Sequence, residues 1–304
     1  MSSYFSAITA SFPWFFPVFV TVLGACIGSF LNVVIYRVPA EKSIVTPGSQ
    51  CACGHSIAWY DNIPALSWLV LRGRARCCGQ KFSFRYPFVE LLTAVLFLIC
   101  WLRFPPAVAV CGWVFVSALI CATFIDLDHM IIPNVFTLGL GVAGVALSLA
   151  VPALHGQHDS FFALASLRAA TISVQGLLVG SGLVLWFALL AEAVLKKEAM
   201  GFGDVTFVGA IGAFCGWQGA VVALFGGSVV GMIWLSIAFV WGKIAGRTAT
   251  AQVLKAETPE GEPAAIGFGV HVPFGPMLAI AAAIHFLFLR DAVARYFEQF
   301  SQMF

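Results

Sequence analysis

Long apolar segments constrain the fold of this 304-residue chain more than any other feature. A helix needs about 20 predominantly apolar residues to cross a bilayer. Hydrophobic residues make up 61% of the chain and charged residues only 10%, which excludes an ordinary soluble domain. We therefore expect an all-α, polytopic membrane protein with about eight transmembrane helices, near residues 14–36, 87–102, 106–125, 134–153, 170–195, 205–217, 218–241 and 274–289.

The distribution of Lys and Arg predicts which side of the membrane each loop faces, because these residues concentrate in cytoplasmic loops. If residues 37–86 are cytoplasmic and the chain crosses eight times, twelve of the sixteen basic residues lie inside and both termini lie outside. Topology then explains the basic residues, so the net charge of +2 does not indicate nucleic-acid binding. The predicted cytoplasmic set is Arg37, Lys42, Arg72, Arg74, Arg76, Lys81, Arg85, Lys196, Lys197, Lys243, Arg247 and Lys255.

Three aspartates lie at ends of apolar segments that this topology places on the cytoplasmic rim. Asp126 and Asp128 end the third segment in FIDLDH, and Asp204 begins the sixth in GFGDVTF. An ionisable side chain at membrane depth costs roughly 2.5 to 3.5 kcal/mol on insertion scales, so such residues suggest function. The structural alternative is that these aspartates cap helices, since Asp is a favoured N-cap residue.

Two unpaired carboxylates within reach of one water molecule suit acid/base hydrolysis. They cannot easily both ionise, so they share a proton and titrate as a unit. One carboxylate can take a proton from water as the water attacks a peptide carbonyl, while the other protonates the carbonyl oxygen. Gly201 and Gly203 fit this interpretation, because glycine permits a non-helical turn and a close approach of substrate. From the residues alone, Asp126 and Asp128 compete as the partner of Asp204.

Five further motifs follow one another along the chain: GSFLNVVIYRVP at 28–39, WYDNIPALSWLVLRGR at 59–74, RYPFVE at 85–90, EAMGFGDV at 198–205 and VPFGP at 272–276. The sequence FIDLDHMIIPN stands between the third and fourth, at the end of the third apolar segment. In this order the motifs resemble the prepilin peptidase family, the GxGD-type intramembrane aspartic proteases. The likeness covers nearly the whole chain.

The resemblance implies catalytic roles for Asp126, which stands seven positions before Pro133, and for Asp204 of the GxGD motif. It also implies cleavage of the leader peptide of type IV prepilins or type II secretion pseudopilins. The expected location is the cytoplasmic face of the bacterial inner membrane. Relatives with a long first loop also N-methylate the new N-terminus, using S-adenosylmethionine. The expected division is a first helix at 1–36, a cysteine-containing loop at 37–86 that serves methylation, and a peptidase core at 87–304.

The cysteines of this loop differ from the family pattern. Other members of the family typically carry two C-x-x-C pairs in the loop, which suit tetrahedral zinc. Here the pairs are compressed to Cys51-Ala-Cys53 and Cys77-Cys78, and adjacent cysteines are poorly placed to ligate one ion. His55 could complete a zinc site in place of one thiol. Reduced thiols without metal are the alternative, and a cytoplasmic disulfide is less favoured because that compartment keeps thiols reduced.

Two other functional classes share some of these features. An ion-coupled transporter also keeps carboxylates at membrane depth, but it favours acids near helix midpoints and repeated halves, and we see neither pattern here. A metal-binding membrane scaffold would make the cysteine loop central and the aspartates incidental. The peptidase hypothesis explains more residues than either.

Overall fold

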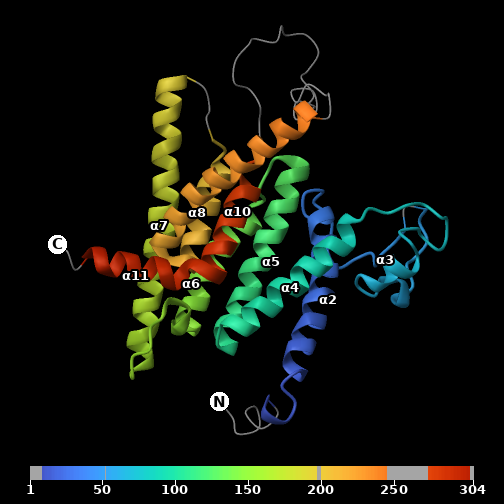
Figure 1. Cartoon of the computed structure of the whole chain (residues 1–304), viewed down its shortest axis with the longest axis horizontal. Coiled ribbons are helices and arrows are strands. Elements are labelled where there is room, and N and C mark those ends of the chain that lie inside the picture. The colour runs from blue at the N-terminus through green and yellow to red at the C-terminus, as the bar shows by residue number, and fades with distance from the viewer. Residues whose placement is uncertain (1–8, 52, 197–199, 245–272, 302–304) are drawn as a thin grey trace.

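The computed structural model describes residues 9–51, 53–196, 200–244 and 273–301. Within these ranges the chain is helical, with no β-strand and two isolated bridges in the first loop (Figure 1). The α-helices are α2 Phe15–Arg37, α3 Leu66–Val70, α4 Arg85–Arg103, α5 Pro106–His129, α6 Leu140–Ala150, α7 Phe162–Leu195, α8 Phe202–Ile244, α10 Gly275–Ile284 and α11 Arg290–Ser301. Short 3-10 turns are η1 Trp59–Asn62 and η3 Pro152–His155, and π turns are η2 Val135–Gly139 and η4 His285–Leu289.

The polytopic all-α prediction is confirmed, whereas the count of eight membrane helices is not. Six helical stretches in the described residues are long and apolar enough to cross a membrane: Phe15–Arg37, Arg85–Arg103, Pro106–His129, Phe162–Leu195, Phe202–Trp241 and Gly275–Gln299. The fourth predicted segment forms a shorter apolar helix over Val135–Ala150. The sixth and seventh predicted segments lie within the one helix α8.

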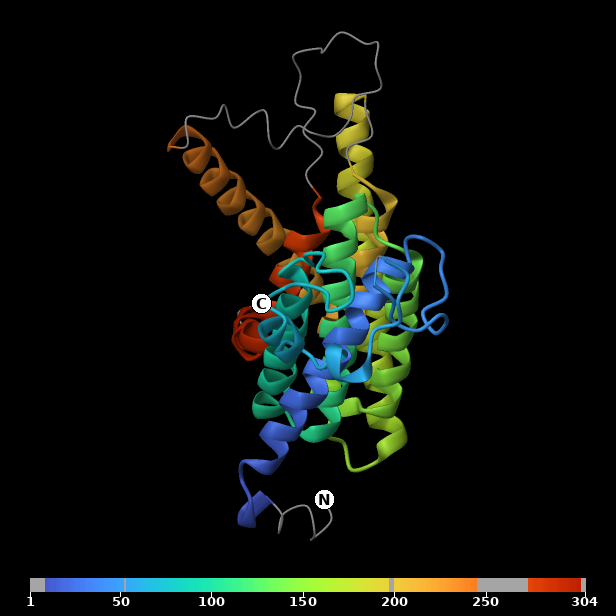
Figure 2. The same cartoon turned by 90° about the vertical axis from the view of Figure 1, so that its right-hand side faces the viewer.

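Gly216 divides α8 at the boundary between those two predicted segments. Its φ of 71° and ψ of 176° leave helical geometry, and a positive φ is readily adopted only by glycine. The chain reverses there, because Gly180 of α7 packs against both Val208 and Ala220. The second arm runs antiparallel to the segment of α10 and η4. Gly219, near the start of the arm, lies beside His285, whereas Gly231, farther along the arm, lies beside Met277. Figure 2 shows this arm leaving the bundle toward Ile244.

Small residues bring neighbouring helices into close contact, as the small-xxx-small stripes predict. A methyl group at Gly24 would lie 2.8 Å from Ala94 Cα, and one at Gly28 would lie 2.7 Å from Glu90 Cα, so α2 packs closely against α4. The tightest crossing joins α7 to α8, where a methyl group at Gly176 would lie 2.0 Å from the carbonyl oxygen of Gly212.

The central core is aromatic and draws on three helical segments. Phe115 of α5 is fully buried and stacks on Phe214 of α8 at a centroid distance of 4.8 Å. It also contacts Phe286 of η4 at 5.1 Å. The cysteine-containing loop lies to one side of this bundle, between the end of α2 at Arg37 and the start of α4 at Arg85 (Figures 1 and 2).

Candidate functional site

Asp126 lies in the last turn of α5, and only 5% of its surface is exposed. The helix ends at His129 because the next residue, Met130, adopts a left-handed conformation with φ of 53° and donates its N–H to the Asp126 carbonyl at 2.8 Å. The carboxylate Oδ2 accepts the backbone N–H of Gly275 at 3.0 Å. A single hydrogen bond from a distant segment therefore orients this buried carboxylate.

Gly275 is the first residue of α10 and is followed by Pro276 at a position where a helix needs no N–H. The amino end of a helix offers free N–H groups and a partial positive charge to an anion. A methyl group at Gly275 would lie 2.6 Å from Asp126 Oδ2, so a side chain here would displace the carboxylate. This glycine belongs to the VPFGP motif, and the sequence-based prediction gave it no role. The Gly-Pro pair at the start of a helix is the signal that could have indicated one.

Asp204 lies in the first turn of α8, is half-buried, and interacts electrostatically with Asp126. Ile132 connects the two positions: methyl groups at Gly203 and Gly275 would lie 3.7 Å and 2.9 Å from its side chain. The structure thus brings together the two aspartates that the resemblance selects. Among the described residues, neither carboxylate forms an ion pair with a basic side chain.

Asp128, the sequence-level competitor of Asp126, is held elsewhere. Both of its carboxylate oxygens accept hydrogen bonds from Nη1 of Arg85 at 2.7 Å. Its side chain is 39% exposed, whereas Asp126 is buried. The structure therefore separates two residues that sequence chemistry left equivalent.

Two of the three aspartates do not fit the alternative that they cap helices. Asp126 and Asp128 stand at the carboxyl end of α5, so neither serves as an N-cap. Asp204 does stand in a first turn, where the helix dipole favours an acid. A non-helical stretch does precede Asp204, at Met200 and Gly201, whereas Gly203 already lies within α8. Neither glycine has a positive φ. Space beside these glycines for a substrate remains a prediction.

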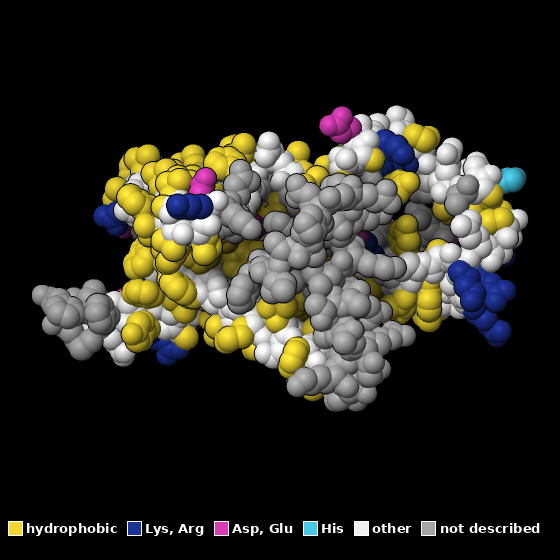
Figure 3. Space-filling model, turned by 90° about the horizontal axis from the view of Figure 1, so that it is seen from above, with side chains coloured by type: hydrophobic (Ala, Val, Ile, Leu, Met, Phe, Trp, Pro, Cys, Tyr) yellow, Lys and Arg dark blue, Asp and Glu magenta, His cyan; other side chains and the backbone are white. Residues whose placement is uncertain are grey.

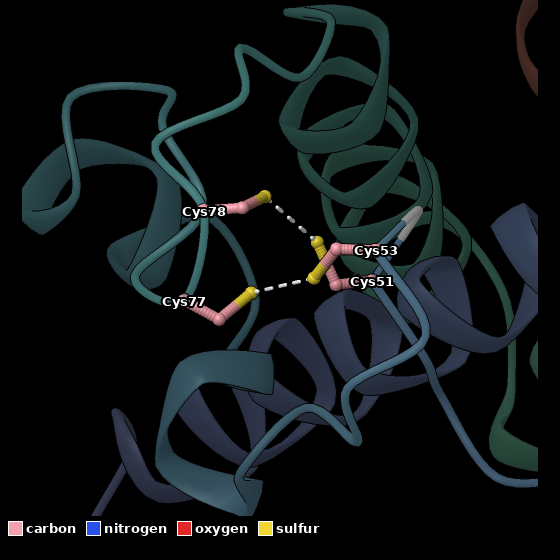
Figure 4. A group of neighbouring side chains, drawn as sticks. All are labelled: Cys51, Cys53, Cys77 and Cys78. Atoms are coloured by element: carbon pink, nitrogen blue, oxygen red, sulfur yellow. Dashed lines mark hydrogen bonds between the residues drawn. The ribbon is translucent and has the colours of Figure 1, made fainter.

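The four loop cysteines form one cluster, in which all Sγ atoms lie within 4.8 Å of one another (Figure 4). Cys51 Sγ lies 3.5 Å from Cys78 Sγ, and Cys53 Sγ lies 3.3 Å from Cys77 Sγ. All four thiols are free. His55 lies beside the cluster with Nδ1 at 3.4 Å from Cys53 Sγ, so four thiols assemble without it.

Two tight turns explain how compressed cysteine pairs reach one point. Each pair is followed by a glycine with positive φ, 87° at Gly54 and 69° at Gly79. Isolated bridges, Gln50–Ser56 and Arg74–Lys81, close the two turns. The predicted difficulty with adjacent cysteines is not found, because the turn directs both thiols of the second pair toward the first pair (Figure 4).

The donor set fits a tetrahedral metal ion. Zn–S bonds of about 2.3 Å at tetrahedral angles put sulfur atoms about 3.8 Å apart, close to the two contacts in the cluster. The backbone N–H of His55 and a thiol hydrogen bond from Cys77 lower the pKa of Cys53 to about 6. The same thiol hydrogen bond raises the pKa of Cys77 to about 12, so Cys53 is the stronger acid of that pair.

A cavity of about 360 Å³ separates the first loop from α2. Its polar lining residues are Ser29, Arg37, Ser49 and Asn62, and none of its lining residues is acidic. The volume suits a small molecule, but these donors do not single out S-adenosylmethionine. We therefore assign no residue to a methyl donor. Glu90 is buried nearby and accepts the Ala65 N–H at 2.7 Å, which attaches the loop to α4.

Figure 3 views the molecule from above and shows Lys and Arg side chains gathered at its right edge, where Figure 1 places the cysteine-containing loop. Arg85, at the end of this loop, reaches Asp128 at the end of α5. The basic loop and the aspartates therefore share one end of the bundle. Lys197, Arg247 and Lys255 of the predicted cytoplasmic set lie outside the described residues.

Two family models match parts of this chain. Residues 22–104 match the family model "Bacterial Peptidase A24 N-terminal domain", and residues 113–236 match "Type IV leader peptidase family". No solved structure matches the chain.

Three curated relatives carry names of the same kind. A "Prepilin leader peptidase/N-methyltransferase" of Myxococcus xanthus is 42% identical over 76% of this chain and 66% of its own length, just under two thirds. One of the same name from Aeromonas salmonicida is 32% identical over 94% of both chains. A "Type 4 prepilin-like proteins leader peptide-processing enzyme" of Escherichia coli is 39% identical over 67% of this chain and 79% of its own length. This chain belongs to the type IV leader peptidase family.

Proposed function

We propose that this protein is an aspartic endopeptidase that removes the leader peptide from type IV prepilins or type II secretion pseudopilins. The observation that carries the proposal is the meeting of Asp126 and Asp204. They come from separate helices, share one end of the bundle, and have no basic partner among the described residues. Family membership supports the substrate class. The comparisons give no support to an ion-coupled transporter.

In the proposed reaction, one carboxylate removes a proton from water and the water oxygen bonds to the scissile carbonyl carbon. The other carboxyl group gives its proton to the carbonyl oxygen, which forms a neutral tetrahedral intermediate. That intermediate collapses as the C–N bond breaks. One of its hydroxyl groups returns a proton to the carboxylate that had protonated the carbonyl oxygen, and the other carboxyl group passes the proton it took from water to the leaving nitrogen. The Gly275 N–H, which holds Oδ2 of Asp126, fixes one member of the pair during these transfers.

We also propose N-methylation of the new N-terminus as a second activity, supported by the names of the relatives. When bound, S-adenosylmethionine would supply an electrophilic methyl group on its sulfonium, and the neutral thioether would be the leaving group. The amine left by cleavage is the nucleophile and must lose its extra proton before the methyl group transfers. The loop at 37–86 is the proposed site of this activity, with the helix at 1–36 before it and the peptidase core at 87–304 after it.

The proposed location is the bacterial inner membrane, with the aspartates facing the cytoplasm. The basic first loop supports this orientation because Lys and Arg favour that side. The hydrophobic segment of the substrate would then lie in the lipid bilayer beside the bundle, with its leader on the cytoplasmic side. No nucleic acid is involved. Substrates from the pilus and the secretion pathway have the same chemistry at the scissile bond.

Zinc is the proposed occupant of the cysteine cluster, with Cys51, Cys53, Cys77 and Cys78 as ligands. The ion would cross-link the two turns of the loop and would have a structural role, because four thiolates leave no open position for substrate. We expect the purified protein to carry about one zinc per chain. Cys53→Ser should lose the metal, whereas Cys26→Ser, an exposed cysteine outside the cluster, should retain it. Metal-free wild-type protein with a folded loop would contradict the proposal.

The catalytic proposal is tested by leader cleavage in detergent. We expect Asp126→Asn and Asp204→Asn each to lower kcat at least about a hundredfold. Asp159→Asn, a matched change in a partly exposed ion pair, should retain activity. Mass spectrometry of the product also reports whether a methyl group has been added. Cleavage at the wild-type rate by the folded Asp204→Asn variant would refute the two-aspartate mechanism.

A further inference from the structure

Arg85 and Asp128 form an ion pair that the physics of their own helices disfavours. Arg85 is the first residue of α4, where the helix dipole opposes a cation, and Asp128 lies in the last turn of α5, where it opposes an anion. Neither residue therefore stabilises the helix on which it lies. The contact between the two helices offsets both unfavourable placements.

The contact is larger than one ion pair. Arg85 Nη1 donates to both carboxylate oxygens of Asp128 at 2.7 Å, and Nη2 donates to the carbonyl oxygen of Phe124 at 3.1 Å. The guanidinium carbon also lies 4.7 Å from the centroid of the Phe124 ring. One side chain from α4 thus holds α5 at two points that bracket Asp126. We call Arg85, Phe124 and Asp128 the Arg85 clamp.

Within the Arg85 clamp, Arg85 contacts the side of α5 that faces away from the peptidase centre. At about 100° per residue, Phe124 and Asp128 lie about 40° apart around the helix, and Asp126 lies about 160° from each. Asp126 accordingly contacts Gly275 of α10 rather than Arg85. The clamp can influence Asp126 only through the backbone of the turn that they share.

We infer that Arg85 and Asp128 are positioning residues for the peptidase centre, an inference that rests on the proposed function. The turn containing Asp126 is the last of α5, and helix ends fray. Fraying would open the hydrogen bond from the Met130 N–H to the Asp126 carbonyl and carry the carboxylate away from Gly275. The clamp holds this turn to α4 and so keeps Asp126 beside Asp204. It also ties the end of the first loop to the peptidase centre.

The exposure of the two side chains distinguishes a positioning role from a contribution to the stability of the fold. The Arg85 and Asp128 side chains are 32% and 39% exposed, and ion pairs of this kind contribute little to global stability. Loss of the pair should therefore lower the activity of each folded molecule rather than the amount of folded protein. The Arg168–Asp159 pair, with side chains 55% and 28% exposed, is the matched control because it lies outside the site.

The test compares Arg85→Gln, Asp128→Asn, the double variant and the charge-swapped pair Arg85→Asp with Asp128→Arg. Leader cleavage gives kcat and KM. We expect each single variant to lower kcat on the order of tenfold with KM unchanged, as a displaced catalytic group does. The double variant should be no worse than Arg85→Gln. The swapped pair should recover part of the activity, because it restores the ion pair but not the two contacts with Phe124. Arg168→Gln should behave as wild type.

Hydrogen exchange gives a readout independent of cleavage. We expect the Met130 amide to exchange faster in Arg85→Gln, while amides in the middle of α5 and in Arg168→Gln stay as in wild type. Wild-type kcat in Arg85→Gln, or multiplicative losses in the double variant, would overturn the inference. So would an Asp128→Asn variant as inactive as Asp126→Asn beside an active Arg85→Gln. Cleavage by Asp126→Asn and Asp204→Asn would instead refute the proposed function.

Discussion

At the residue scale, the position of Asp126 depends on the absence of a side chain at Gly275. A methyl group there would lie 2.6 Å from Asp126 Oδ2 and 2.9 Å from the Ile132 side chain, too close for either contact. We expect Gly275→Ala to lower kcat for leader cleavage on the order of a hundredfold, because it displaces the carboxylate that we propose as catalytic. The measurement is cleavage by the folded variant.

Gly201→Ala is the control for this prediction at the GxGD motif. A methyl group at Gly201 would lie 3.9 Å from Asp204 Oδ2, an ordinary contact. The variant should therefore keep the two carboxylates in place. If Gly275→Ala cleaves as fast as wild type, the Gly275 N–H does not orient Asp126 during catalysis. If only Gly201→Ala is slow, the substrate approaches at that glycine, as the sequence predicts.

At the element scale, the α7–α8 crossing sets the place of Asp204. Gly176 and Gly212 meet so closely that a methyl group on the first would lie 2.0 Å from the carbonyl oxygen of the second. We expect Gly176→Val to force the helices apart and cost more than about 3 kcal/mol, since overpacking a tight contact is expensive. Thermal unfolding in detergent checks this. Gly182→Ala, in the same helix with nothing within 4 Å, should melt no lower than wild type.

At the scale of the whole molecule, a polar cluster holds the reversal of α8 at the end away from the aspartates. His155 Nε2 lies 3.0 Å from Ser148 Oγ, and His155 also hydrogen-bonds to the carbonyl oxygen of Ala213. The carbonyl of Ala213 lies at the end of the first arm of α8, where helix carbonyls have no helical partner. It also accepts the Ser173 hydroxyl at 2.8 Å.

This cluster predicts an acid-sensitive fold. Burial, and then the charge of Arg290, lower the pKa of His155 from 6.5 to about 4. The unfolded chain binds the proton more readily, so this contribution to stability is complete above pH 6.5 and is lost as the pH falls toward 4. We expect the unfolding temperature of wild type to fall over that range, and the fall to be smaller in His155→Gln. In His158→Gln, a change at an exposed histidine, the fall should match wild type.

Much of the fold and of the site could be predicted from local sequence. Apolar runs of membrane length require helices whatever their neighbours, and unpaired aspartates in such runs are costly enough to indicate chemistry. The sequence also indicated a break between two apolar segments near residue 217, and it marked the four loop cysteines as candidate metal ligands. The resemblance selected Asp126 over Asp128, which residue chemistry alone did not separate.

Only the tertiary structure decided which of these groups meet. Gly275 donates to Asp126 across 149 positions, Arg85 holds Asp128 across 43, and Cys51 reaches Cys78 across 27. The local sequence shows whether a segment favours an apolar environment and which reactions its side chains can support. Contacts between distant segments depend instead on how helices pack, and here on glycines that let backbones approach. The sequence by itself therefore determined which reactive side chains the protein has, whereas helix packing determined which of them contact one another.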